Sequence, residues 1–310
     1  MWKTALLLIL SIIVIPTLGF IYDEPLTEQE WEMLKPVLIT YGVATSVVFI
    51  LSSITKNYSQ VDKLWSIIPI VYAWEAAFIS DFDDRGILMA VLVTIWGLRL
   101  TYNFSRRGGY SWKFWEGEED YRWSILQSRK EFNASWKWVL FNLFFISIYQ
   151  MGLIMLFTLP IIKSVVGTPL NIYDYLLTAV FIFWVVWETV ADQQQWVYQK
   201  EKYRQLDNDE ELKGKYKVGF THTGLWGLVR HPNYLAEQAI WITFYFFSVS
   251  ATGDWLNWTI TGCVLLCALF FGSSDFSEGI SANKYPQYKV YQTKVGRFLP
   301  KFKGGFKPSD

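Results

Sequence analysis

The polar stretch from His222 to Glu237 holds the residues of this 310-residue chain best suited to chemistry. Pro232 has no N–H and a preset φ, so it predicts the first turn of a helix that begins beside His231 and runs apolar to about Phe247. Unpaired N–H groups and the helix dipole favour an anion there, and Arg230 with His231 adds donors for a phosphate or a carboxylate. We therefore expect an anion-binding site at this helix start.

Two further polar side chains lie on the same predicted helix. Asn233 and Glu237 are four residues apart, so they lie one turn apart on one face. A carboxylate inside an apolar run is costly in hydrocarbon and needs a partner or a cavity. We therefore expect Glu237 to line a site. The alternative is an interfacial basic loop followed by a membrane helix, which needs no ligand.

A second polar face is predicted on the helix that precedes this stretch. Glu188 and Asp192 are one turn apart, and Gln195 and Gln199 extend the same face from the membrane into the cytosol. These side chains could hold ribose hydroxyls or an amide. An ordinary amphipathic exit from the membrane explains the same pattern equally well.

A cluster of arginines ends one of the predicted apolar helices. Arg99 lies at its cytoplasmic end, and Arg106 and Arg107 follow, just before Gly108 and Gly109. Arginines beside flexible glycines could clamp phosphates, the 2′-phosphate of NADPH included. Arginines at a cytoplasmic helix end also commonly only fix topology, so both interpretations stay open.

Composition indicates that membrane helices position these residues. Hydrophobic residues make up 52% of the chain, and its 17 Trp, 18 Tyr and 23 Phe suit the interfacial belts of a polytopic membrane protein. The 28 basic side chains balance 28 acidic ones, which argues against a nucleic-acid binder. Two histidines and two cysteines, Cys263 and Cys267, give no disulfide framework and no zinc pattern, so we expect no metal.

The hydropathy predicts eight apolar helices, each near the ~20 residues needed to cross a bilayer. They cover residues 4–22, 36–54, 64–80, 86–102, 138–162, 172–191, 234–250 and 255–273. We therefore predict an all-α fold, a polytopic helical membrane bundle. No internal repeat or flexible linker divides the chain, so we expect a single membrane domain over residues 1–310.

The charges of the polar segments indicate how the chain is oriented. Lys and Arg concentrate near the N-terminus and in the segments 106–137, 192–233 and 274–310, whereas the opposite connections are acidic or nearly neutral. Positive-inside logic therefore puts both termini in the cytoplasm. We expect a multi-pass integral membrane protein, in the inner membrane of a bacterium or the endoplasmic reticulum of a eukaryote.

Three groups of residues in this polar stretch closely resemble the C-terminal signature of the steroid 5α-reductase family, especially its microbial branch. They are Gly224-Leu225-Trp226, then Arg230-His231-Pro232-Asn233-Tyr234, and finally Glu237. Related signatures occur in sterol Δ14-reductases and in isoprenylcysteine carboxyl methyltransferases. The resemblance covers about residues 59–300. It makes residues 1–35 an extra N-terminal helix and loop before a seven-helix reductase-like core over 36–310, with the NADPH-binding half at about 172–300.

The resemblance implies NADPH as the cofactor. In that family an acidic residue at the position matched by Asp192 helps to hold the cofactor, and a tail tyrosine that contacts it matches Tyr285. The arginines of the expected cofactor site would hold phosphates, and its other residues would fix the ribose and the nicotinamide. The full expected cofactor-binding set is Arg99, Arg106, Arg107, Asp192, Arg230, His231, Asn233, Tyr234, Glu237 and Tyr285.

The resemblance also implies two catalytic positions. The run from Ser59 to Trp65 resembles a motif of the microbial branch and makes Asp62 a candidate proton donor or its orienter. In the animal reductases a Glu and a Tyr contact the carbonyl of the substrate, and spacing sets Asp62 against the Glu and Trp96 against the Tyr. Trp96 cannot donate a phenolic proton, so the chain departs from the steroid-type acid pair and a steroid substrate is not assigned.

These features favour an NADPH-dependent reductase of a conjugated carbon–carbon double bond, an enone, in a steroid-like or other lipid. Hydride would pass to the β-carbon, and a protonated Asp62, its pKa raised by apolar surroundings, would stabilise the charge that develops on the enone oxygen. One alternative is an S-adenosylmethionine-dependent membrane methyltransferase, a class that shares the Arg230 to Tyr234 signature. Another is a non-catalytic lipid-binding protein of the same fold. We expect a monomer whose partners are this lipid substrate and membrane lipids.

Overall fold

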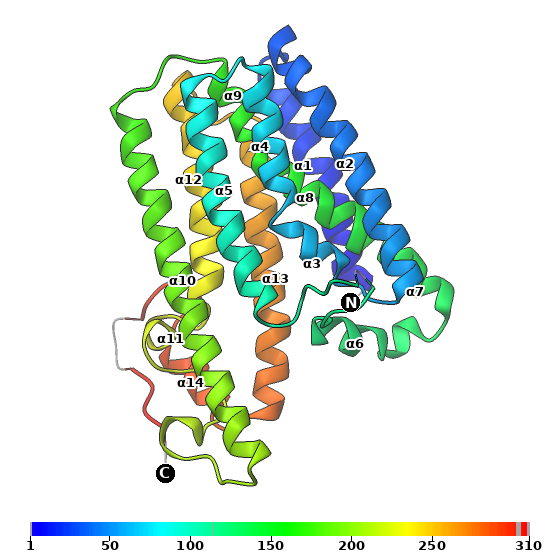
Figure 1. Cartoon of the computed structure of the whole chain (residues 1–310), viewed down its shortest axis with the longest axis vertical. Coiled ribbons are helices and arrows are strands. Elements are labelled where there is room, and N and C mark those ends of the chain that lie inside the picture. Colours follow the sequence, from blue (N-terminus) through cyan, green and yellow to red (C-terminus); the bar gives the residue numbers. More distant parts are fainter. Residues whose placement is uncertain (1, 114, 302–304, 309–310) are drawn as a thin grey trace. The chain divides into compact units, whose positions relative to one another are not determined.

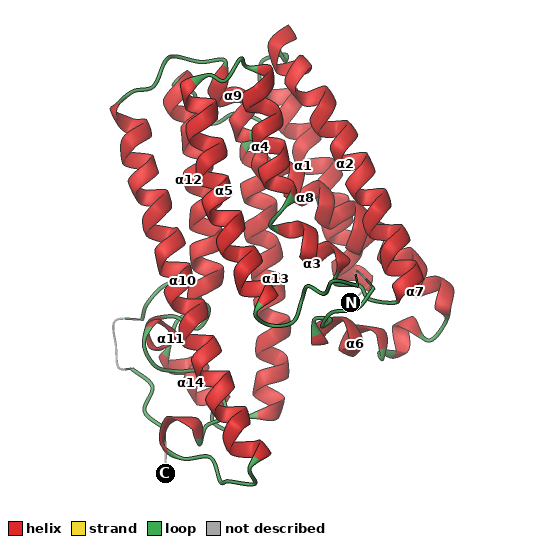
Figure 2. Ribbon diagram, in the orientation of Figure 1, coloured by secondary structure: helices red, strands yellow, loops and turns green. Residues whose placement is uncertain are grey.

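The computed structural model describes residues 2–113, 115–301 and 305–308. Figure 2 shows these residues as helices joined by loops. Their β-type pairing is limited to an isolated parallel bridge between Val229 and Gly296. The predicted all-α fold is therefore confirmed.

The chain forms two compact units. Unit 1 contains Met1–Ala179 and Trp241–Leu266, and unit 2 contains Val180–Ile240 and Cys267–Asp310. Three long helices contribute residues to both units, and they are α10 (Ile172–Asp207), α12 (Pro232–Thr252) and α13 (Ile260–Lys284). The predicted single domain stays a prediction.

Unit 1 is built around α4 (Ile68–Ile79), which packs against α2 (Glu28–Thr55), α5 (Asp84–Ser105) and α8 (Gln150–Thr158). Figure 1 shows α4 and α5 running side by side. Gly97 of α5 makes this approach possible, because a Cβ at this position would lie 2.5 Å from the backbone oxygen of Ser66. The other helical elements of unit 1 are α1 (Trp2–Tyr22), α3 (Gln60–Trp65), α6 (Tyr121–Gln127), η1 (Lys130–Phe132), α7 (Ser135–Phe141), η2 (Asn142–Tyr149) and α9 (Pro160–Val165).

Local sequence explains where two of these helices begin. Thr27 and Glu30 form a capping box at the start of α2, in which each side chain satisfies a backbone N–H of the other residue. Asp83 caps α5, because its Oδ1 accepts the backbone N–H groups of Arg85 at 3.0 Å and Gly86 at 3.2 Å. These caps satisfy N–H groups that helix geometry alone leaves without partners.

Two predicted helices are interrupted in the structure. The helix predicted over residues 64–80 divides into α3 and α4. Pro69, which has no N–H to continue a helix from α3, stands in the first turn of α4. The helix predicted over residues 138–162 continues from α7 through a π-helical stretch, η2, into α8, and Pro160 then begins α9. Apolar periodicity predicted the existence of both segments but not these breaks.

Among the described residues, five helices are long and apolar enough to cross a membrane. They are α2, α5, the run Ser135–Val165, α10 and α13. The protein is therefore a multi-pass membrane protein. The predicted spans over 4–22, 64–80 and 234–250 form helices outside this group. Leu6–Tyr22 of α1 is a shorter apolar helix, α4 has 12 residues, and the first two turns of α12 carry the polar residues Asn233 and Glu237.

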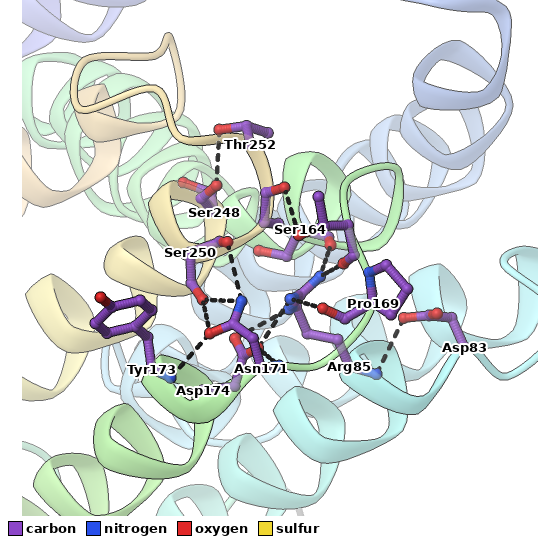
Figure 3. A network of polar contacts seen from close by, with 12 residues as sticks. Asp83, Arg85, Ser164, Pro169, Asn171, Tyr173, Asp174, Ser248, Ser250 and Thr252 are labelled. Atoms are coloured by element: carbon purple, nitrogen blue, oxygen red, sulfur yellow. Dashed lines mark hydrogen bonds and ion pairs between the residues drawn. The ribbon is translucent and has the colours of Figure 1, made fainter.

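A buried ion pair fixes one end of unit 1 (Figure 3). Arg85 of α5 donates through Nε to Asp174 Oδ1 at 3.0 Å and through Nη2 to Asp174 Oδ2 at 2.8 Å. The same guanidinium also donates to the backbone oxygens of Ser164, Thr168 and Pro169. Because its donors meet both a carboxylate and three carbonyls, this arginine holds the connection between α9 and α10 against α5.

Unit 2 has an aromatic core formed by residues that come from distant parts of the sequence. Its members are Val218, Phe220, Tyr288, Tyr291 and Val295. The short elements beside it are η3 (Gly214–Tyr216), α11 (Leu225–Leu228) and α14 (Tyr288–Lys294). This core packs the tail after α13 against the segment that precedes α12.

Candidate functional site

Glu278 of α13 is the centre of a buried polar cluster in unit 2. Its Oε1 accepts from Arg230 Nε at 2.7 Å and contacts His231 Nε2 at 2.8 Å. Its Oε2 accepts from Arg230 Nη2 at 3.1 Å and from Gln292 Nε2 at 2.6 Å. The carboxylate therefore orients both residues at the start of α12. Glu278 was not predicted, because the last apolar helix was expected to end at residue 273, whereas α13 continues to Lys284 and carries Glu278 into the cluster.

The tail takes up further donors of this cluster. Arg230 Nη1 donates to the backbone oxygen of Gln292 at 3.1 Å and also to that of Val295. The backbone N–H groups of Arg230 and His231 donate to the carbonyls of Gly296 at 2.8 Å and Arg297 at 3.2 Å. In this structure Arg230 thus joins the loop, α13 and the tail. Its predicted contact with a phosphate stays a prediction.

His231 is buried and stacked. Its ring lies 5.2 Å from that of Tyr234, with 16° between the planes, and Tyr234 in turn contacts Phe270. Burial lowers the pKa of His231, and this effect outweighs the opposing hydrogen bond and charge of Glu278. His231 therefore favours the neutral imidazole, which makes it a hydrogen-bonding and stacking residue rather than a fixed cation.

Helices α10 and α12 bring polar side chains together beside this cluster. Asn233 Nδ2 donates to Asp192 Oδ1 at 3.3 Å. Glu188, one turn before Asp192, and Glu237, one turn after Asn233, are each 4% exposed, as is Asp192 itself. The structure therefore joins Asp192 to Asn233, two residues predicted independently from two helices. It also buries a carboxylate one turn away on each helix.

Tyr285 lies at the end of unit 2 where α13 meets the tail. Its ring covers Gly219, whose φ is +82° and whose missing Cβ would lie 2.4 Å from the ring. The buried Lys202 donates to the backbone oxygen of Gly219 at 3.2 Å and lies 3.5 Å from the Tyr285 hydroxyl. Gly219 and Lys202, neither of them predicted, therefore position this tyrosine.

Asp62 lies in unit 1, on α3. Trp123 Nε1 donates to Asp62 Oδ2 at 3.2 Å, and Ser59 Oγ accepts the backbone N–H of Asp120 at 2.9 Å. Burial raises the pKa of Asp62, the charge of Asp120 raises it further, and Arg122 with hydrogen bonds from Ser59 and Trp123 acts in the opposite direction. This direction agrees with the requirement for a protonated acid. The partners in and before α6 were missed because they lie about 60 residues away in the sequence.

Trp96 is fully buried in an aromatic cluster of unit 1. Its ring meets that of Trp241 edge to face at 4.8 Å, and Trp241 lies 4.1 Å from Phe157. Such contacts are typical of core packing. Trp96 therefore has a structural environment, and its predicted catalytic part stays a prediction.

The three arginines predicted to clamp phosphates belong to unit 1, with Arg99 inside α5 and Arg106 and Arg107 just after its end. Arg106 donates from Nε and Nη2 to Asn103 Oδ1 at 2.9 and 2.6 Å, while Arg107 is exposed and Arg99 is half-buried. Gly108 has a φ of +84° and accepts the backbone N–H of Glu118 at 2.9 Å. The glycine here turns the chain after the helix, which is a conformation that other residues rarely adopt.

Comparison with known proteins places this architecture in a family. Residues 48–295 match the family model described as "Protein of unknown function (DUF1295)". The protein described as "Uncharacterized protein C594.04c" of Schizosaccharomyces pombe is 39% identical over 263 residues, which cover 81% of this chain and 74% of the relative. No solved structure matches the chain. Because the family model covers most of the sequence and includes both α10 and α12, this chain belongs to the DUF1295 family.

Proposed function

We propose that this protein is an NADPH-dependent reductase of a conjugated carbon–carbon double bond in a lipid. The observation that carries the proposal is the contact between Asp192 and Asn233 in unit 2, flanked by the buried carboxylates of Glu188 and Glu237. Carboxylate oxygens accept hydrogen bonds, and ribose hydroxyls can donate them. The side-chain amide of Asn233, beside these carboxylates, could pair with the carboxamide of nicotinamide. These residues fit the ribose and nicotinamide of a dinucleotide, and the resemblance to steroid 5α-reductases supports the same assignment.

Each unit has one task in this proposal. When bound, NADPH would supply the hydride that the β-carbon of the enone accepts, and residues of unit 2 would bind and orient the cofactor. Asp62 of unit 1 would give its proton to the oxygen of the reduced enone, which makes an enol. Water would then protonate the α-carbon and take the proton from the oxygen, and a further proton from water would restore the Asp62 carboxyl. The raised pKa of Asp62 increases the fraction of the protein in which this carboxyl carries a proton.

Cofactor binding tests the proposal directly. The purified protein in detergent would be melted with NADPH, NADH and S-adenosylmethionine in parallel. A ligand at 100 times its dissociation constant stabilises the folded state by about 2.7 kcal/mol, so we expect NADPH to raise the Tm. Asp192→Asn and Asn233→Ala should abolish this shift. Asp207→Asn and Asn208→Ala are the matched controls, because both residues are exposed at the end of α10.

The outcomes separate the alternative functions. A shift with S-adenosylmethionine alone contradicts the proposal and favours a methyltransferase. Absence of a shift with all three ligands favours a lipid-binding protein without this chemistry. Given an NADPH shift, turnover of a panel of sterol, polyprenyl and fatty enones identifies the substrate.

The proposal also places the cofactor site on the cytoplasmic side, where NADPH is available. The lysine-rich and arginine-rich segments support this orientation. A C-terminal epitope should be digested by protease only in vesicles that expose the cytoplasmic face. Digestion only in vesicles of the opposite orientation would contradict the placement.

A further inference from the structure

Unit 2 contains a pocket of about 270 Å³ beside α10. The described side chains that line it carry amides, hydroxyls and an ammonium group. They include Gln193, Gln194, Tyr198, Lys215, Thr221 and Thr223. The volume is smaller than the roughly 300–1,000 Å³ of pockets that hold a whole small molecule. The pocket therefore suits one part of a larger polar ligand.

Hydrogen bonds between the two walls of the pocket hold its shape. Gln194 Oε1 accepts the backbone N–H of Leu225 at 2.9 Å, and Trp226 Nε1 donates to the backbone oxygen of Ala191 at 3.0 Å. The hydroxyl of Thr221 donates to Gln195 Oε1. Because these bonds join α10 to α11 and to the segment before it, the pocket is preformed rather than assembled by a ligand.

Gly224 brings the second wall close to the helix. Its φ is +63°, and an added Cβ would lie 2.6 Å from the side-chain oxygen of Gln194. A larger residue would therefore be strained and would displace the amide of Gln194. The close approach keeps this amide at the pocket wall.

The charge of the lining favours an anionic ligand. Lys215 is exposed, and its ammonium group lies 5.4 Å from the ring centre of Tyr216. The buried Tyr198 donates its hydroxyl to the backbone oxygen of Lys215 at 3.3 Å and so fixes the backbone that carries this lysine. A lysine on a fixed backbone beside amides and hydroxyls matches a phosphate next to a heterocycle or sugar.

The pocket lies next to the carboxylate used in the proposed function. Gln193 follows Asp192 directly, and Tyr198 is six residues further along α10, which is about 9 Å along the helix axis. A ligand with one end at Asp192 therefore reaches the pocket by continuing along the same helix.

We propose that this pocket binds the adenosine phosphate end of a nucleotide, with Lys215 contacting the 2′-phosphate and the glutamine amides contacting the adenine edge. The inference rests on the proposed function, in which the nucleotide is NADPH. Amide side chains pair with the donor and acceptor atoms of adenine, and a lysine ammonium binds phosphate as a point charge. Lys215 thereby becomes a residue that distinguishes NADPH from NADH.

Binding of adenosine 2′,5′-bisphosphate and of NADPH to the full-length protein in detergent tests this inference. Lys215→Ala should weaken both affinities by about tenfold or more, because it removes a charge-assisted contact, and should leave NADH affinity unchanged. Gly224→Ala should weaken all three ligands. Lys217→Ala is the matched control, since this exposed lysine lies two residues beyond Lys215. An unchanged melting curve without ligand shows that Lys215→Ala folds.

The possible results separate the inference from the proposed function. If NADPH binds and Asp192→Asn abolishes binding, while Lys215→Ala and Gly224→Ala bind like the wild type, the pocket assignment is wrong and the reductase proposal stands. If adenosine 2′,5′-bisphosphate binds in a Lys215-dependent way and NADPH does not, the pocket holds adenosine phosphates and the reductase proposal is wrong. Binding of neither ligand overturns both.

Discussion

Single side chains in unit 2 depend on partners that neutralise their charge. Arg230 is buried, and Glu278 meets it with two hydrogen bonds. A second pair on unit 2 joins the exposed Asp275 of the same helix to the half-buried Arg297 of the tail. Buried and exposed ion pairs differ in energy, because removing one partner of a buried pair leaves an uncompensated charge away from water. The two pairs therefore form a natural comparison.

We expect Glu278→Gln to lower the free energy of unfolding by on the order of 3 kcal/mol, because the charge of Arg230 stays buried without its counter-ion. Asp275→Asn should change it by less than about 1 kcal/mol, because solvent reaches the exposed Asp275 carboxylate and screens its charge. Chemical denaturation in one detergent measures both. Equal effects of the two substitutions would contradict the central place given to Glu278.

The raised pKa of Asp62 should make the free energy of unfolding depend on pH. Its folded pKa is raised, so its stabilising contribution is complete below the unfolded value of about 3.9 and is lost as the pH rises through the folded pKa. The stability of the wild type should therefore fall relative to Asp62→Asn as the pH increases from 4 to 8. A flat difference would show that the carboxyl is not held protonated. Glu116→Gln, an exposed substitution in the nearby loop, is the control.

Asp62→Asn should also reduce turnover of an enone by roughly 10²- to 10⁴-fold, because an amide cannot deliver the proton. NADPH affinity should be retained, since Asp62 belongs to unit 1 and the proposed ribose contacts to unit 2. Single-turnover kinetics with a saturating cofactor measures this effect. Full turnover in the variant would remove Asp62 from the mechanism.

Residue types and spacing were enough to predict some of these contacts. Asp192 and Asn233 were selected on separate helices and are joined by a hydrogen bond in the structure. Glu278 and Trp123 were missed, because their hydrogen-bond partners lie 47 and 61 positions away in the sequence. The spacing of residues within one helix gives no sign of such distant pairs. The sequence predicts well which polar side chains are costly to bury in an apolar helix. It does not predict which distant residue forms the hydrogen bond or ion pair with each of them.

At the scale of elements, the sequence did not predict where helices are interrupted or which side chains join one helix to another. Apolar runs predicted every long helix of the described chain. Helices α3 and α4 and the π-helical stretch η2 all pack against α2, and the spacing of apolar residues within one segment does not record such contacts. The clamp of Arg85 on Asp174 is a similar case, because it joins α5 to α10 across 89 positions (Figure 3).

The Arg85 clamp predicts a strong distinction between two basic residues. Arg85→Lys keeps the charge but loses the fork that meets Asp174 and the three carbonyls, so we expect a loss of about 3 kcal/mol in unfolding free energy. Asp174→Asn should cost a similar amount, and the double variant should cost less than the sum, because both remove the same contact. Asp84→Asn, on the exposed side of the α5 start, serves as the control. Strict additivity would contradict a direct coupling.

At the scale of the molecule, the family region does not contain every contact that the two units use. The family match ends at residue 295, whereas Gly296 and Arg297 accept the N–H groups at the start of α12 and Phe306 packs on Tyr291. Before the match begins, Asp23 accepts the backbone N–H of Trp258 at 2.8 Å, and Phe20 stacks on the same tryptophan. Segments at both ends of the sequence are therefore part of the packed protein.

A truncation series tests the contribution of the tail. Removal of residues 288–310 deletes α14, the Gln292 contact to Glu278 and the carbonyls that accept from Arg230, so we expect loss of the NADPH-induced rise in Tm. Removal of residues 307–310 alone keeps Phe306 and these contacts, and it should retain the rise. A full response in the longer truncation would show that the tail does not support the site.

The pairing of the tail with the start of α12 also sets an order of events during synthesis. Arg230 leaves the ribosome roughly 65 residues before Gly296, the residue that accepts its backbone N–H, and this interval lasts about 3–13 s at 5–20 residues per second. Throughout that time the nascent chain carries an arginine whose native carbonyl partners have not been made. A transcript with a late stop codon would leave the protein permanently at this stage, inserted in the membrane but without a completed site.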